Sequence, residues 1–546
     1  MTEPRTQTRR RFLRGAVRLG AGAAALAALR PHAVPSALAG PKLPAPVEVL
    51  LADLREATAA DFARGQARGV APVAPAGRAG LRASAGGVFT SGTLALPFPA
   101  THAGLHWVIE GADAEAVAVE LRTSVDGGSW FPWHPVRIEA VAEAAADREV
   151  FAALAGAAGA RFAQYRATFR SAEPTTLTAM TVTAINAVDG PQGTATAAAT
   201  GQASFATPDG KLFTVITREG WGCDERLRFR GTGELWPEMY VPAKKVVLHH
   251  TATSNAYAPT DGAAEVRAIY AYHAQTLRWG DIGYNSLIDQ YGTIYEGRHG
   301  RGETPDAREI LSADVVAGHV YGHNYGSTGV AALGTFDQSS PTATPTTAMK
   351  TAIEDVVTFE CGRQGIDPGT ASDFLKSDGT WHTGLQGCSG HSDSYSTECP
   401  GTKLKAYLPT LRTTVRERLK WGAAPTLSSR LSQQAPLTAP ASLSFAWIPG
   451  TVTSYCLEGW YKPADSENIT YLRGYANPLR GEPGYGDPLA KRQGWTPTTA
   501  DSGDISFPGL PAGHYTMHVR GPATSAYEAN LTYLVASATP TKPGRK

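Results

Sequence analysis

Three short segments of the chain hold side chains that together could bind a catalytic zinc ion. The segment KKVVLHHTAT contains His249, the segment GHSDSYSTECPG contains His391 and Cys399, and Tyr284 lies in DIGYNSLIDQYGTIYEGR. Two imidazoles and one thiolate are a usual ligand set for a catalytic zinc, which keeps its fourth position open for water. If the three segments converge in space, the protein hydrolyses its substrate with a water whose pKa falls to about 7 on the metal.

Each of these side chains also has an ordinary structural explanation. A histidine is more often a core or surface residue than a ligand, Cys399 can form a disulfide, and Tyr284 can be a packing residue. His319 and His323 imitate a metal-binding pair at i, i+4. Glycines flank this pair and disfavour a helix, so we expect His319 to line the cleft or support the ligands rather than to bind a second metal.

Strands and helices alternate around these segments, which predicts an α/β domain over residues 212–421. The β-branched apolar run 245–249 predicts a buried strand that ends at His249. Helices are expected over 263–277 and over 346–361, and Pro409 is expected to start the last helix. These elements must bring the candidate ligands to one point.

The flanking sequence divides by composition. Residues 40–84 are rich in Ala, Arg, Gly and Pro and predict a spacer with one helical patch near 46–63. Short alternating segments over 85–190 predict a β-sandwich, residues 191–211 a linker, and residues 428–546 a small β-rich module that binds or spaces. Three tryptophans of the sandwich could form a sugar-binding platform, although core packing explains them better; they are Trp107, Trp130 and Trp133.

The first 39 residues resemble a twin-arginine export signal. Arg9 and Arg10 precede a small-residue apolar run, and an A-x-A-like cleavage site follows at 37–39. No later run of about 18 apolar residues predicts a membrane span. We therefore expect the protein to be secreted, periplasmic or associated with the cell wall.

Charge and cysteines add two expectations. The chain has 50 Lys and Arg and 49 Asp and Glu; removal of residues 1–39, with seven Arg and one Glu, leaves 43 and 48, a net charge of −5. That balance argues against a nucleic-acid partner, which calls for a basic face. With Cys399 as a ligand, four cysteines remain in an oxidising compartment and allow three full pairings, of which we favour Cys361 with Cys388.

Residues 213–420, a little over a third of the chain, resemble the type 2 N-acetylmuramoyl-L-alanine amidases and the peptidoglycan recognition proteins that share their fold. Each motif alone is weak, but six in order are specific. They are REGWG (218–222), VLHHTA (247–252), WGDIGYNSLI (279–288), GTIYEGR (292–298), GHVYGHNYGSTGVAALGTF (318–336) and GHSD…TECPG (390–401).

This resemblance implies a central mixed sheet with flanking helices and a zinc hydrolase that cuts the amide between N-acetylmuramic acid and L-alanine of peptidoglycan. It implies Zn²⁺ ligands at His249, His391 and Cys399, and it selects His249 over His250 because the ligand is the first residue of the H-x-[ST]-A segment. Tyr284 matches the tyrosine beside the metal-bound water, and Thr397 matches the position that steadies the oxyanion. We expect a monomer.

The rival interpretation is a binding protein that uses the same fold to hold peptidoglycan without cutting it. Non-catalytic relatives commonly lose the cysteine ligand, and this chain keeps Cys399. Residues 299–317 depart from the family pattern, since recognition proteins place there a Trp-containing loop that helps choose between stem peptides. The choice between lysine-type and diaminopimelate-type peptidoglycan therefore stays open.

Overall fold

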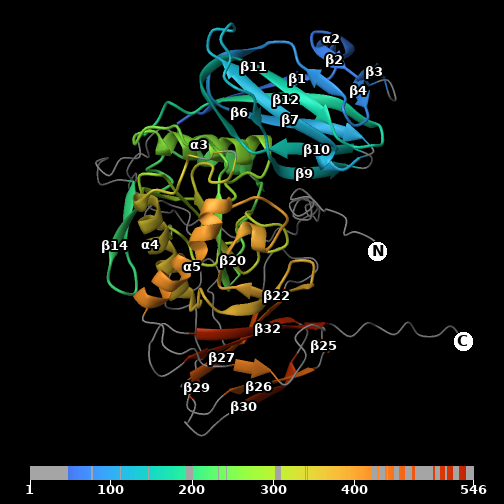
Figure 1. Cartoon of the computed structure of the whole chain (residues 1–546). Coiled ribbons are helices and arrows are strands. Elements are labelled where there is room, and N and C mark those ends of the chain that lie inside the picture. The colour runs from blue at the N-terminus through green and yellow to red at the C-terminus, as the bar shows by residue number, and fades with distance from the viewer. Residues whose placement is uncertain are drawn as a thin grey trace, which may run out of the picture.

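The computed structural model describes residues 47–419 apart from gaps at 75–77, 111, 145–146, 192–200, 232, 242, 302–308, 339 and 341. Beyond residue 419 it describes only strands between 427 and 536. The expected export signal therefore lies outside the described residues. Figure 1 shows a strand-rich N-terminal unit, a central unit of strands and helices, and a C-terminal group of strands.

The N-terminal unit, called here the β unit, consists of the described residues from 47 to 191. Twelve strands form one hydrogen-bonded sheet, in which β11–β6–β12 are central. Its elements are β1 (Leu50–Glu56), α2 (Ala59–Phe62), β2 (Gln66–Arg68), β3 (Ala71–Val73), β4 (Gly80–Ala83), β5 (Val88–Thr90), β6 (Leu94–Glu110), η3 (Ala114–Ala116), β7 (Val117–Ser124), β8 (His134–Pro135), β9 (Ile138–Ala144), β10 (Asp147–Ala152), β11 (Ala155–Phe169) and β12 (Thr175–Asn186). Trp107 is 1% exposed in the core of this unit.

Residues 40–84 were expected to form a spacer, but those that the structure describes form strands β1 to β4 and helix α2 of the β unit. Strand β1 pairs antiparallel with β12 along its whole length, from Leu50 with Asn186 to Glu56 with Met180. Glu56 is buried and accepts a hydrogen bond of 2.7 Å from the hydroxyl of Tyr165. Long-range pairing thus overrides the local helical pattern over Leu50–Glu56, and only the short helix α2 forms within the helical patch expected near 46–63.

The central unit has a mixed seven-stranded sheet in the order β13-β14-β19-β18-β20-β17-β23. The pairs β14–β19, β18–β20, β20–β17 and β17–β23 are parallel, and the pairs β13–β14 and β18–β19 are antiparallel. The elements of the sheet are β13 (Gln202–Ala206), β14 (Leu212–Ile216), β17 (Lys245–His250), β18 (Ser286–Ile288), β19 (Ile294–Glu296), β20 (Ser327–Ala332) and β23 (Cys388–Gly390).

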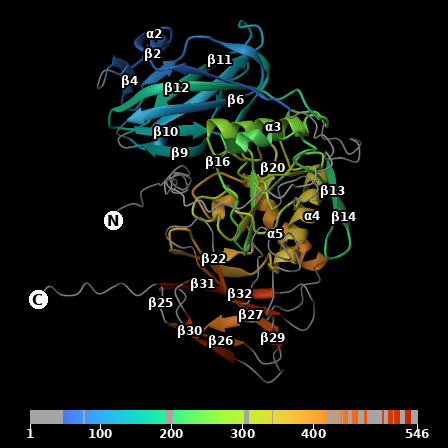
Figure 2. The same cartoon turned by 180° about the vertical axis from the view of Figure 1, so that it is seen from behind.

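Helices cover both faces of this sheet. Alternate strand residues such as Leu287 and Ala331 pack with α3 in one core, whereas their neighbours Ile288 and Val330 pack with α4 and α5 in another. In both views α3 lies between the central sheet and the β unit (Figures 1 and 2). The remaining elements of the unit are η4 (Glu225–Arg228), β15 (Phe229–Arg230), β16 (Gly233–Glu234), α3 (Gly262–Ala271), the π-helical turn η5 (Tyr272–Thr276), α4 (Thr347–Gln364), β21 (Ala371–Leu375), β22 (Trp381–Gln386), η6 (His391–Asp393) and α5 (Thr402–Arg418).

Two helix boundaries have clear local causes. Helix α4 starts where the Thr346 hydroxyl accepts a hydrogen bond from the N–H of Met349, and it ends at Gly365, whose φ of 64° suits glycine. Pro409 does not start the last helix, because α5 begins at Thr402 and Pro409 lies inside it. Pro409 is exposed, so the backbone carbonyl that loses its N–H partner has access to water.

The expected disulfide between Cys361 and Cys388 is not formed. Both residues are free thiols and lie fully buried in the core beneath α4 and α5. There they pack as small apolar side chains, a common role of unpaired cysteine. Burial is the leading reason that the pKa of each thiol is raised above its ordinary value.

The described C-terminal residues form two sheets. One has three strands in the order β24-β26-β30, and the other has six, with β31 between β27 and β32. Their elements are β24 (Leu427–Ser429), β25 (Leu437–Thr438), β26 (Ala441–Trp447), β27 (Ser454–Tyr461), β28 (Thr470–Arg473), β29 (Thr496–Pro497), β30 (Asp504–Leu510), β31 (Gly513–Arg520) and β32 (Glu528–Ala536). Among the residues that the structure describes, no helix combines the length and apolar character needed to cross a membrane.

Candidate metal centre and active site

His249, His391 and Cys399 come together at the carboxyl ends of β17 and β23. One ligand atom from each residue lies within 4.8 Å of the others. The Nδ1 atom of His249 is 3.5 Å from the Sγ atom of Cys399, and the rings of His249 and His391 are 4.7 Å apart between centroids. Donors around one tetrahedral zinc lie about 3.5 Å apart, given bonds of about 2.0–2.3 Å. The three side chains therefore fit zinc by both type and spacing.

Strand alternation separates His249 from His250. The ring of His249 lies beside Tyr284 and the other candidate ligands. The Nδ1 atom of His250 instead accepts a hydrogen bond of 3.2 Å from the N–H of Phe336. Burial, helped by the positive charge of Arg137, lowers the pKa of His250 to about 4. His250 is thus a neutral structural histidine beside the cluster.

The loop between His391 and Cys399 folds back on itself through one backbone hydrogen bond and one bond from the backbone to a side chain. The N–H of Ser392 donates to the carbonyl oxygen of Cys399 at 2.8 Å. The N–H of Gly390 donates to the carboxylate of Asp393 at 2.8 Å. The Sγ atom of Cys399 in turn lies 3.4 Å from the N–H of His250. These contacts hold both loop ligands against the end of β17.

Tyr284 and Thr397 flank this cluster. The ring of Tyr284 is 5.5 Å from that of His249, and its side chain is 5% exposed. The Thr397 hydroxyl oxygen accepts a hydrogen bond of 3.2 Å from the N–H of Cys399. That bond leaves the hydroxyl hydrogen of Thr397 to donate elsewhere.

The histidines at 319 and 323 have different partners. The Nδ1 atom of His319 lies 3.0 Å from the Nε2 atom of His249, which fits its expected supporting role. The Nε2 atom of His323 instead lies 3.0 Å from the Nδ1 atom of His382. In the described part of the chain, only the cluster with Cys399 offers three converging metal ligands.

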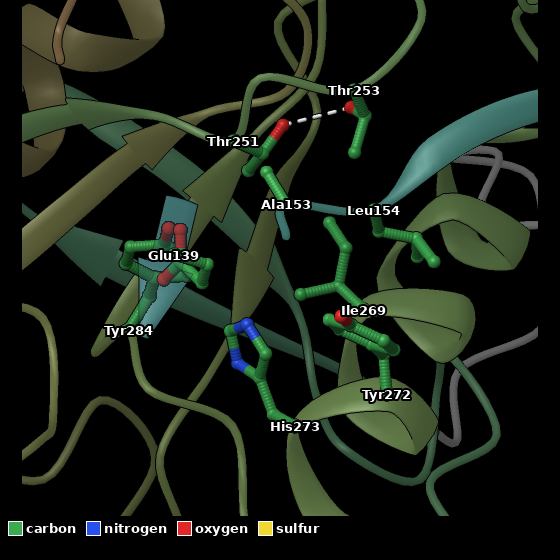
Figure 3. A pocket seen from close by; sticks show the side chains of 9 residues that line it. All are labelled: Glu139, Ala153, Leu154, Thr251, Thr253, Ile269, Tyr272, His273 and Tyr284. Carbon is green, nitrogen blue, oxygen red and sulfur yellow. Dashed lines mark hydrogen bonds between the residues drawn. The ribbon is translucent and has the colours of Figure 1, made fainter. Parts of the chain in front are cut away.

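A small pocket adjoins Tyr284, and Figure 3 shows the side chains around it. Its lining includes His273, which lies within the helix expected over 263–277 and was not among the candidate site residues. The Nδ1 atom of His273 accepts a hydrogen bond of 3.1 Å from the N–H of Gly283, so its proton lies on Nε2. A π-helical turn carries His273, and such turns are frequent at functional sites. The full lining is Glu139, Ala153, Leu154, Thr251, Thr253, Ile269, Tyr272, His273 and Tyr284.

A buried charge cluster holds the segment that carries Tyr284. The Asp281 carboxylate lies between the Nη1 atoms of Arg218 and Arg298, at 2.9 and 2.6 Å, and all three side chains are 0% exposed. Burial alone would raise the pKa of Asp281, but the two arginines outweigh burial and hold that pKa well below its usual range. Arg218 of the REGWG motif and Arg298 of the GTIYEGR motif thus both bind Asp281, a structural role that the sequence alone did not reveal.

Comparison with known proteins agrees with this geometry. A family model for N-acetylmuramoyl-L-alanine amidase matches residues 239–402. Peptidoglycan-recognition protein SC2 of Drosophila simulans is 32% identical over 160 residues, which cover 29% of this chain and 68% of that protein. The N-acetylmuramoyl-L-alanine amidase of Homo sapiens is 28% identical over 225 residues, which cover 39% of this chain but only 31% of the human protein.

A solved structure of human PGRP-IBETAC in complex with glycosamyl muramyl pentapeptide is 26% identical, covers 36% of this chain and 94% of its own, and has a TM-score of 0.26. The sequence matches carry the assignment. The central unit is an α/β domain of the amidase type, and the chain belongs to the family of N-acetylmuramoyl-L-alanine amidases and peptidoglycan recognition proteins. Peptidoglycan binding or amidase activity is the function of this family.

Proposed function

We propose that this protein is a zinc-dependent amidase that hydrolyses the bond between N-acetylmuramic acid and L-alanine in bacterial peptidoglycan. One observation carries the proposal: the ligand atoms of His249, His391 and Cys399 lie within 4.8 Å of one another, and Tyr284 packs beside them. The relatives that match include both amidases and recognition proteins. A complete ligand set next to a pocket favours catalysis over recognition alone.

Each residue of the candidate site has its own chemical role in this proposal. Zinc bound by the three ligands would supply an activated water and polarise the scissile carbonyl. The Tyr284 hydroxyl orients the attacking oxygen, and the Thr397 hydroxyl donates to the oxygen that gains negative charge. The departing nitrogen takes up the proton that the attacking water loses as the new carbon–oxygen bond forms and the carbon–nitrogen bond breaks. The neutral His273, whose Nδ1 accepts from the N–H of Gly283, keeps its own proton and can only donate a hydrogen bond from Nε2.

Location and assembly follow from the same proposal. Peptidoglycan lies outside the cytoplasmic membrane, which agrees with the export signal expected at residues 1–39. All three candidate ligands come from a single chain, so a monomer is sufficient for activity.

Digestion of purified sacculi tests the proposal. The mature zinc-loaded protein should release new L-alanine amino termini. A chelator should abolish that release by removing the ion, and Cys399→Ser should abolish it because one of the three metal ligands is lost. Cys223→Ser is the matched control, since Cys223 is a free thiol outside the cluster. Sacculus binding is measured in parallel. Binding without release by the wild-type protein would show a recognition protein, and release by Cys399→Ser would remove the zinc mechanism.

A further inference from the structure

The β unit and the central unit share one buried core at α3. Phe151 of the β unit packs in the same cluster as Ile269 and Tyr272 of the segment α3–η5. The Tyr272 hydroxyl donates to the carbonyl oxygen of Ala152 at 2.6 Å. The β unit therefore keeps a fixed position relative to the metal centre, and a surface on it can act together with that centre.

The outer face of the sheet in the β unit carries a cluster of aromatic and arginine side chains. Along β7, Leu121 is buried and the next residue, Arg122, lies on the outer face. On the neighbouring strand β11, Arg166 projects from the same face. The centroid of the Trp133 ring lies 4.5 Å from the guanidinium carbon of Arg122 and 4.6 Å from that of Arg166. The Trp130 ring lies 4.7 Å from Arg122, so both indoles cover the outside of the sheet.

These aromatic rings are partly open to solvent. Trp130 and Trp133 are half-buried, and Phe131 between them is 47% exposed. Core packing explains Trp107, which is 1% exposed, but not the other two tryptophans. The N–H of Phe131 donates to the carbonyl oxygen of Thr123 at 3.0 Å, which holds the loop against β7. We call the four residues Arg122, Trp130, Phe131 and Trp133 the aromatic platform, and its rings are ordered without a ligand.

Arg122 supplies this platform with a hydrogen-bond donor. Its Nε and Nη2 atoms both donate to the Oε1 atom of Gln164. Among the described residues Arg122 has no carboxylate partner, whereas Arg166 pairs with Glu120 at 2.6 Å. The Nη1 group of Arg122 therefore remains to donate to a ligand that lies on the indoles.

A short stretch of chain joins the platform to the loop that carries two candidate metal ligands. Four residues after Trp133, Arg137 forms ion pairs with Asp337 and with Glu398, the latter at 3.2 Å. Glu398 directly precedes Cys399 in the chain. Because four residues span at most about 14 Å, a polymeric substrate can occupy the metal centre and the platform at once, whereas a single sugar cannot.

We propose that the aromatic platform binds a sugar ring of the same glycan strand whose muramoyl group lies at the metal centre. The C–H face of a pyranose ring packs on an indole, because the face of the indole carries partial negative charge. The Nη1 group of Arg122 donates to a hydroxyl or acetamido oxygen of that sugar. The choice of a peptidoglycan strand rests on the proposed amidase function.

The affinity of the full-length zinc-loaded protein for peptide-free glycan strands tests this site. These strands hold no amide that the amidase would cut, so calorimetry measures binding independently of turnover. Trp133→Ala should weaken binding about tenfold, and Trp133→Phe, which keeps an aromatic face, should stay within about threefold of wild type. Phe229→Ala is the matched control, because Phe229 is 43% exposed beside Arg228 but lies on β15 of the central unit.

Equal affinities of wild type and Trp133→Ala, or no binding by wild type, would overturn the platform. If Trp133→Ala does not fold, Phe131→Ala decides instead, since it alters an exposed side chain. A loss of about threefold in its affinity supports the proposal, and an unchanged affinity overturns it.

Kinetics on two substrates test whether the platform and the metal centre act on one strand. The ratio of the half-saturating concentration of sacculi to the KM for an N-acetylmuramoyl-L-alanyl peptide with a single sugar should rise about tenfold in Trp133→Ala. An unchanged ratio would overturn the shared strand. If the wild-type protein cuts neither substrate, the amidase proposal fails, and binding of the peptide-free strands still decides whether the platform takes sugar.

Discussion

The side chains of His249 and His319 form the first link of a hydrogen-bond chain that leads away from the three candidate metal ligands. The Nε2 atom of His249 lies 3.0 Å from the Nδ1 atom of His319, and the Nε2 atom of His319 lies 3.4 Å from the Ser327 hydroxyl. That hydroxyl donates to the carbonyl oxygen of His323. Because the Ser327 hydroxyl uses its hydrogen in this bond, it accepts from the Nε2–H of His319, and the Nδ1 of His319 in turn accepts from the Nε2–H of His249. The Nδ1 lone pair of His249 is then left for a metal.

His319→Ala should therefore weaken zinc binding about 10- to 100-fold, as loss of a ligand's supporting partner commonly does. Competition with a chromogenic chelator measures the affinity. His323→Ala is the control, because His323 pairs with His382 and not with the cluster. Equal affinities of wild type and His319→Ala would contradict the supporting role.

Substitution of the two adjacent histidines should have opposite effects on the metal. His249→Gln should lose stoichiometric zinc, whereas His250→Leu should keep it and lose about 1–3 kcal/mol of stability, because the buried N–H of Phe336 loses its acceptor. Metal analysis and chemical unfolding of the two variants check both parts. Zinc loss in His250→Leu but not in His249→Gln would identify His250, and not His249, as the ligand from β17.

Tyr284→Phe should keep zinc and lower kcat about 10²- to 10³-fold, because the ring that packs on His249 stays and only the hydroxyl is removed. Tyr291→Phe is a suitable control, since Tyr291 is 41% exposed on the turn after β18. An unchanged kcat would reduce Tyr284 to a packing residue.

Asp281→Asn should cost about 3–5 kcal/mol, since it leaves Arg218 and Arg298 buried without their shared carboxylate. A carboxyl group whose pKa is lowered by folding adds stability above its unfolded pKa of about 3.9, and this contribution is lost as pH falls further. The difference between wild type and Asp281→Asn should thus be full at pH 7 and shrink below about pH 4. Urea unfolding across this range tests it, with Asp378→Asn, at an exposed surface pair, as the near-neutral control.

Replacement of both Arg9 and Arg10 by Lys should retain the uncleaved protein in the cytoplasm, because those residues form the motif of the expected export signal. Cell fractionation and the size of the product on a denaturing gel provide the measurement. Normal export of the doubly substituted protein would count against the twin-arginine route.

Local patterns predicted the elements that hold the candidate ligands. The run 245–249 is a strand, its alternation directs His249 and His250 to opposite faces, and the ordered motifs selected the three residues that the structure brings together. These signals are local because each depends on a few neighbouring side chains.

The contributions of the β unit could not be predicted in this way. Leu50–Glu56 is a strand only because it pairs with β12, more than 100 residues away. Glu139 reaches the pocket because Arg137 contacts Asp337 and Glu398, which are far from it in the chain. Sequence periodicity does not predict which distant surfaces will pack together. The places of His273 and Glu139 in the pocket lining therefore become visible only in the structure.

The shared core at α3 has a consequence for any attempt to dissect the protein. A fragment that starts at residue 201 would expose Ile269 and Tyr272 to water and leave Glu265 and Arg267 without their partners from the first 191 residues. Such a truncated piece should aggregate even though it retains every candidate metal ligand. In this chain we therefore expect the sheet that precedes the amidase-type domain to be an inseparable part of it, and not a detachable accessory module.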